Sequence, residues 1–142
     1  MKIRFAKKYI KDNQIINVDE VQTVPIIEHN FKRDKLYTLI MVDQDAPSRK
    51  NPVNKYWLHW IMININDRGL GDEAIKYQPG SPPQGSGLHR YCFILFEQPY
   101  EIKNNTILKF VDGNRAKFSP LQFEKRFDLK PIACITFLTE KK

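Results

Sequence analysis

The chain has 142 residues, of which 42% are hydrophobic and 27% charged, with a formal net charge of +7. This length predicts a single domain over 1–142 that needs no disulfide or metal to hold its core, and no apolar stretch is long enough for a helical membrane span. The basic residues are dispersed, which excludes a polybasic tail, and no nucleic-acid-binding motif accompanies them.

Short apolar runs with a two-residue period predict six strands, separated by stretches rich in turn-forming residues. The two longest such stretches, APSRKNPVNK and YQPGSPPQGSG, are expected to be loops, and loops of this length in a small domain tend to carry function. The predicted strands are Gln14–Val18, Val21–Ile27, Lys35–Val42, Trp57–Asn64, His89–Glu97 and Ile132–Leu138.

One short helix near the C-terminus is predicted by the segment SPLQFEKRF. Ser119 is a suitable N-cap, Pro120 fits the first helical position, and Gln122 stands where a capping box places its partner. Phe123 and Phe127 are four residues apart and would dock the helix on the core. Many strands with one late helix predict a mainly all-β domain, a β-sandwich with a small helical addition.

The two cysteines, Cys92 and Cys134, both lie within apolar runs. We interpret them as reduced, buried thiols of a cytoplasmic protein. The basic N-terminal segment has no apolar core of the kind that signal peptides carry, which agrees with this location.

Titratable groups stand at the ends of three predicted strands, and alternation decides which faces they share. Asp43 and Asp45 continue one apolar face of their strand, His59 shares a face with isoleucines, and His89 and Tyr91 share a face with other apolar residues. These groups could line a pocket where the strands end. Each histidine alone could equally be a satisfied core residue, and each aspartate could form a turn.

The segments DQDAPSR, WLHW and PPQGSGLHRY resemble, in order and spacing, the two signature regions of the phosphatidylethanolamine-binding protein family, which includes Raf kinase inhibitor protein. The resemblance covers most of the chain and implies a β-sandwich with a small anion pocket and a cis Ala46–Pro47 bond. The pocket residues of the family carry over onto Asp43, Asp45, His59, Pro82, His89 and Tyr91, and Trp57 matches the tryptophan beside the first histidine. With the adjoining loop residues Pro79, Gly80 and Ser81, these make ten candidate ligand-binding residues.

The chain also departs from the family pattern. Gln44 stands where the family usually has proline, and the loop around Pro79 and Ser81 differs from that of animal members. The chain ends soon after the last predicted strand, so we expect a short form without the C-terminal helix that covers the pocket in many members.

Three functions are compatible with these features. The resemblance implies a binding protein for phosphate-bearing ligands such as the phosphatidylethanolamine headgroup, which modulates a signalling partner in the manner of a kinase or protease inhibitor. A hydrolase or metal-dependent enzyme using Asp43, Asp45, His59 and His89 is an alternative, although we do not expect catalysis, a cofactor or a metal. The basic surface could also contact membranes or RNA, without specific nucleic-acid recognition.

Overall fold

The computed structural model describes residues 1–142 and contains two sheets of unequal size. The larger sheet has six strands in the order β3-β9-β8-β5-β6-β7, and all of its pairings are antiparallel except that of β3 with β9. Its strands are β3 Gln14–Ile15, β5 Leu36–Asp43, β6 Trp57–Ile65, β7 Asp72–Ile75, β8 His89–Gln98 and β9 Lys130–Thr139.

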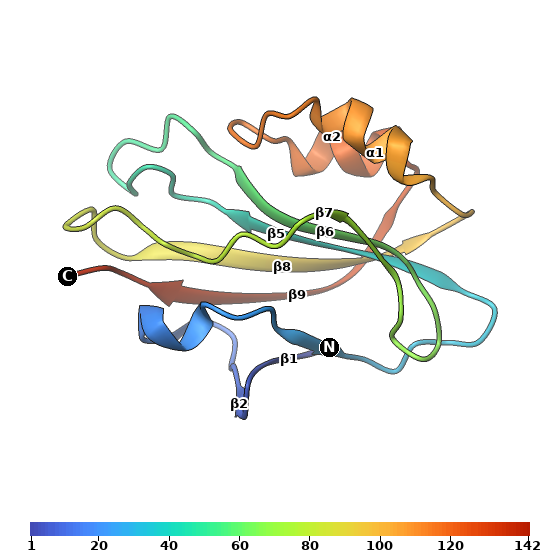
Figure 1. Cartoon of the computed structure of the whole chain (residues 1–142), viewed down its shortest axis with the longest axis horizontal. Helices are drawn as coiled ribbons and strands as arrows, with labels where there is room; N and C mark the ends of the chain where they lie inside the picture. Colours follow the sequence, from blue (N-terminus) through green and yellow to red (C-terminus); the bar gives the residue numbers. More distant parts are fainter.

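A smaller sheet and two helices lie on opposite faces of the larger sheet (Figure 1). The small sheet pairs in the order β2-β1-β4, and none of the helices is long and apolar enough to cross a bilayer. These elements are β1 Lys2–Phe5, β2 Lys8–Tyr9, β4 Ile26–Glu28, the 3-10 helix η1 Val18–Val21, α1 Asn104–Val111 and α2 Pro120–Arg126.

The central strands are buried on both faces, which explains their continuous apolar runs. One core cluster lies beneath the helices and includes Ile40, Leu58 and Phe123. The second lies beneath the small sheet and includes Met41 and Tyr91. The prediction of a mainly β domain of the sandwich type is confirmed.

The structure has two α-helices where the sequence predicted one. Helix α2 begins as expected, with Ser119 Oγ accepting a hydrogen bond from the Gln122 amide at 3.1 Å. Helix α1 was missed because its N-cap, Lys103, offers no side-chain cap. Burial of Ile107 and Val111 against the sheet stabilises α1 instead. This tertiary contact cannot be predicted from the sequence of the segment itself.

The N-terminal third differs most from the prediction. Of the expected strand Val21–Ile27, Val21 ends a 3-10 helix capped by Asn17, and only Ile26 and Ile27 are extended, in β4. Pro25, directly before β4, has no amide for strand pairing. The expected strand Gln14–Val18 is reduced to β3, and the short strands β1, β2 and β7 were not predicted. All of these lie in the small sheet or near an edge of the large one, where pairing partners decide strand formation.

Strand β6 contains a register shift against β5, between Met41 and Val42. Met41 pairs with Trp60 but Val42 pairs with Leu58, so His59 is an extra residue in β6. An extra residue of this kind is a β-bulge, and it resets side-chain alternation. The predicted sharing of a face between His59 and the isoleucines after it is therefore wrong for Ile61 and Ile63, which lie in the core cluster beneath the helices.

Candidate functional site

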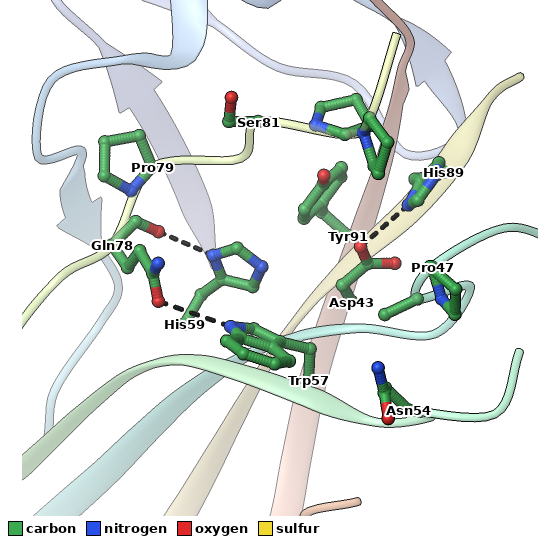
Figure 2. Close-up of a pocket in the computed structure, with 13 residues that line it drawn as sticks. Asp43, Pro47, Asn54, Trp57, His59, Gln78, Pro79, Ser81, His89 and Tyr91 are labelled. Atoms are coloured by element: carbon green, nitrogen blue, oxygen red, sulfur yellow. Dashed lines mark hydrogen bonds and ion pairs between the residues drawn. The ribbon is translucent and has the colours of Figure 1, made fainter. Parts of the chain in front are cut away.

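A cavity of about 250 Å³ opens where β5, β6 and β8 end, on the face of the large sheet that carries the small sheet. Figure 2 shows side chains from these strands and from the loops after β5 and β7 converging around it. The cavity is lined by Asp43, Ala46, Pro47, Asn54, Trp57, His59, Gln78, Pro79, Ser81, Pro82, Pro83, His89 and Tyr91.

Asp43 and His89 form a buried pair in one wall of the cavity. His89 Nδ1 lies 2.8 Å from Asp43 Oδ2, and the Asp45 amide donates to Asp43 Oδ1 at 2.8 Å. On the other side of the ring, His89 Nε2 lies 2.8 Å from Ser86 Oγ, which in turn lies 2.7 Å from the Pro83 carbonyl oxygen. A carboxylate accepts only, so His89 Nδ1 is the donor in its contact with Asp43.

His59 forms the opposite wall, and the bulge in β6 places it there. Its Nδ1 lies 2.6 Å from the Gln78 carbonyl oxygen, which can only accept, so Nδ1 carries a proton. Burial lowers the pKa of His59 despite the opposing effects of this hydrogen bond and of Asp43. Neutral His59 therefore presents an unprotonated Nε2, which points into the cavity in Figure 2.

Tyr91 forms a rigid wall between the two histidines. Its ring packs edge-on against His59 at 5.2 Å between centroids and stacks on Phe137 at 5.2 Å. Burial, and secondly the charge of Asp43, raise the pKa of Tyr91, so its hydroxyl stays protonated. Tyr91 can therefore donate a hydrogen bond. Its packing against His59 and Phe137 fixes the position of the ring.

The family to which this fold and site belong follows from a comparison with protein-family models. The model for phosphatidylethanolamine-binding protein matches residues 6–133. The chain belongs to this family.

Solved structures of phosphatidylethanolamine-binding proteins share its fold. Two come from Plasmodium species: the P. vivax protein is 23% identical, with a TM-score of 0.78 over 99% of this chain and 84% of that chain. The P. falciparum protein is 20% identical, with a TM-score of 0.72 over 98% and 83%. Carboxypeptidase Y inhibitor, solved with its cognate proteinase, is 20% identical, with a TM-score of 0.80 over 99% and 82%.

Of the ten candidate ligand-binding residues, eight line the cavity and Asp45 and Gly80 do not. Asp45 lies in the turn after β5 and binds Arg90 through Oδ1 to Nη2 at 2.8 Å and Oδ2 to Nε at 3.0 Å. Burial alone would raise the pKa of Asp45, but Arg90 outweighs it and holds this pKa below its ordinary value. The expected continuation of the Asp43 face to Asp45 is wrong because the strand ends at Asp43.

Gly80 lies behind the cavity wall and shapes it from there. Its carbonyl oxygen accepts a hydrogen bond from Gln22 Nε2 at 3.0 Å. A Cβ atom on Gly80 would lie 3.1 Å from two ring atoms of Tyr91. A glycine is needed here because the loop backbone approaches the Tyr91 ring so closely.

The rim of the cavity offers few backbone hydrogen-bond donors. Pro79, Pro82 and Pro83 all line it, and none has a backbone N–H. Pro47 lines the facing side, and the Ala46–Pro47 bond is cis, as the resemblance implied. Any anion in the cavity must therefore depend mainly on side-chain donors.

Sequence reasoning missed Arg115, which supports the site from outside. Its Nη1 donates to the carbonyl oxygens of Leu58 and His59 at 3.1 Å, and its Nη2 donates to that of Lys76 at 2.8 Å. These bonds tie β6 to the loop that carries Gln78. Arg115 stands alone between two helices, so no motif could have identified it.

Three other contributors were also missed. Asn54 and Gln78 line the cavity, and Ser86 holds His89 from behind. Ser86 could have been found, since it lies three residues before His89 within the signature region. No three His, Cys, Asp or Glu side chains anywhere in the chain gather at a spacing that would hold a metal ion.

Proposed function

We propose that the chain binds a phosphate-bearing ligand of headgroup size in this cavity and that, in the cytoplasm, it regulates a signalling protein such as a kinase or a protease. The observation that carries the proposal is the small cavity with the Asp43–His89 pair in one wall and His59 in the other. Family membership supports the ligand class, and a relative solved with its cognate proteinase supports a protein partner.

The size of the cavity favours a headgroup over a whole lipid. Its volume of about 250 Å³ is below the roughly 300–1,000 Å³ of pockets for drug-sized ligands. Acyl chains would therefore remain outside it. The net charge of +7 would draw the protein toward anionic membranes or phosphoproteins.

The hydrogen-bonding groups of the cavity suit a singly charged phosphate. The Tyr91 hydroxyl and the Asn54 amide can donate to phosphate oxygens. Neutral His59 accepts a proton at Nε2, which matches the P–OH group of a phosphate monoester below its second pKa of about 6. The carboxylate of Asp43 can face the ammonium of ethanolamine.

A second candidate function is acyl transfer, because Ser86, His89 and Asp43 form a chain with two separations of 2.8 Å. This is the order of a serine nucleophile, its base and the orienting carboxylate. The contact of Ser86 Oγ with the Pro83 carbonyl counts against it, because the hydroxyl donates its one proton there. That proton is then not directed at His89 Nε2, so binding ranks first.

A fluorophosphonate probe separates the two functions. We expect no labelling of Ser86 by intact mass and peptide mapping. Labelling at Ser86 that disappears in His89→Gln would replace the binding proposal with acyl transfer.

Histidine side-chain NMR tests the binding proposal directly. The chain has three histidines, and His29 packs against Phe31 and Tyr37, away from the cavity. Titration with O-phosphorylethanolamine should shift His59 and His89 saturably and leave His29 unmoved, with inorganic phosphate as the comparison. Equal shifts for both ligands would show that ethanolamine contributes nothing, and no shift with either would refute an anion pocket.

A further inference from the structure

The two cysteines contact each other across neighbouring strands. Cys92 Sγ on β8 lies 2.9 Å from Cys134 Sγ on β9. In the register of this pair, Cys92 is opposite Thr136 and Cys134 is opposite Ile94, so the cysteines are diagonal neighbours on one face. The separation exceeds an S–S bond of about 2.05 Å by less than one ångström.

The two thiols differ in access to solvent. Cys92 is 4% exposed and belongs to the core cluster beneath the helices, whereas Cys134 is exposed. The expectation of two buried thiols is thus wrong for Cys134, which lies on the open part of the strand. A dissolved reagent can reach Cys134 first and Cys92 only through it.

The contact also prepares Cys134 as a nucleophile. A hydrogen bond between the two sulfurs lowers the pKa of Cys134 to about 7, although partial burial opposes this. The pKa of Cys92 is raised, by the same bond and by burial. The buried sulfur therefore keeps the proton while the exposed sulfur is a thiolate in a large part of the molecules near neutral pH.

We propose that Cys92 and Cys134 are a site of reversible oxidation, at which a low-molecular-weight disulfide such as oxidised glutathione converts them to an intramolecular disulfide. The Cys134 thiolate attacks one sulfur of the reagent, a mixed disulfide forms, and one glutathione thiolate leaves. Cys92 then loses its proton to water and attacks Cys134 Sγ, which releases the second glutathione thiolate. Two protein thiols are oxidised, and one reagent disulfide is reduced to two thiols.

The backbone already holds the pair in place for the second step. Ladder pairing of β8 with β9 runs from His89–Thr139 to Glu97–Lys130 and encloses both cysteines. Cys92 therefore already lies beside the sulfur of the mixed disulfide, and it should resolve that adduct quickly. The cysteines lie on the helix-covered face, opposite the cavity, so their chemistry does not depend on ligand binding.

Treatment of the reduced protein with oxidised glutathione tests the proposal. Intact mass should fall by two hydrogens without a retained glutathione, and non-reducing peptide mapping should join the peptides of Cys92 and Cys134. Dithiothreitol should restore the starting mass. The melting temperature of the oxidised form should exceed that of the reduced form, because the bond closes a long loop of the unfolded chain.

Two variants identify the roles of the two sulfurs. Cys92→Ala should retain a persistent glutathione adduct at Cys134, because no resolving thiol remains. Cys134→Ser changes an exposed side chain and should fold and gain no adduct. A stable glutathione adduct on the unsubstituted protein, covalent dimers, or two free thiols under conditions that modify Cys92→Ala would each overturn the proposal.

Discussion

Asp43 at the end of β5 and His89 at the start of β8 share a hydrogen bond of 2.8 Å, and their side chains are 6% and 1% exposed. The Asp45–Arg90 pair two residues later has equally short contacts, but the Arg90 side chain is 36% exposed. If one partner is removed, water can therefore solvate the remaining Arg90 side chain but can hardly reach the remaining His89 side chain.

We therefore expect Asp43→Ala to cost more stability than Asp45→Ala. Removing Asp43 strands a buried imidazole, and breaking a buried pair typically costs about 3–5 kcal/mol. Removing Asp45 leaves a guanidinium that water reaches, with an expected loss of about 1–3 kcal/mol. Urea denaturation of both variants measures the difference, and equal losses would contradict this division between the pairs.

Acidification should strengthen anion binding through His59. The pKa of His59 is lowered in the free protein, and an anion against Nε2 would raise it, so binding takes up a proton. A phosphodiester such as glycerophosphorylethanolamine has no titratable P–OH, so its affinity should rise as the pH falls toward the free-protein pKa. Calorimetry at several pH values measures this. His59→Gln should remove the dependence and His29→Gln should not.

The lowered pKa of His59 also predicts that acid, which should strengthen anion binding, destabilises the ligand-free protein. A lowered histidine pKa means that the unfolded chain binds more protons than the folded one below the ordinary value of 6.5. The free energy of unfolding should therefore fall as the pH drops below 6.5, and less steeply in His59→Gln. Since the pKa of His29 is also lowered by burial, His29→Gln measures the part due to that residue. An unchanged slope in His59→Gln would contradict the assignment.

Gly80→Ala should narrow the cavity although Gly80 itself does not line it. The added methyl meets the Tyr91 ring at 3.1 Å, and Tyr91 cannot retreat because Phe137 stacks behind it. We expect at least a several-fold loss of phosphate affinity, by NMR titration. Gln84→Ala, an exposed change on the same loop, is the matched control and should leave affinity unchanged.

Arg115→Ala should loosen the wall that carries His59. It removes three hydrogen bonds to backbone carbonyl oxygens, with an expected stability loss of about 1–3 kcal/mol and weaker phosphate binding. Arg115→Lys keeps the charge but cannot span the same carbonyls, so it should recover little. Arg68→Ala, at an exposed position, should have no effect in either measurement. Full recovery by lysine would mean that charge alone matters.

The sequence predicted much of this site, but the arguments from side-chain alternation held for some residues and failed for others. Alternation correctly placed Asp43 and Tyr91 each on an apolar face of its own strand, and the family resemblance implied that these strand ends meet. The structure pairs the two residues directly. His59 reaches the cavity through a bulge, which alternation cannot anticipate. The position of Asp45 depended on where β5 ends, and strand ends are set by pairing partners rather than by local sequence.

The fold was predictable in its centre and less so at its margins. Buried strands such as β5 and β8 are predictable from their long apolar runs. In contrast, β1 packs Ile3 and Phe5 into the core beneath the small sheet, and the exposed strand β2 forms by pairing with β1. Arg115 and α1 act through tertiary contacts, and their own segments carry no cap or periodic signal that would have identified them.

The bulge in β6 also limits how this strand can be exchanged between relatives. The extra residue lets one strand serve the helix-covered core along most of its length and the cavity at its start. A chimaera that omitted that residue would keep Leu58 opposite Val42 and Trp57 opposite Asp43, but it would lose the imidazole that the bulge brings to the cavity. Relatives must therefore keep the one-residue excess of β6 over β5 at this point. Substitutions on either side of the bulge should be easier to accept than the deletion of a single residue.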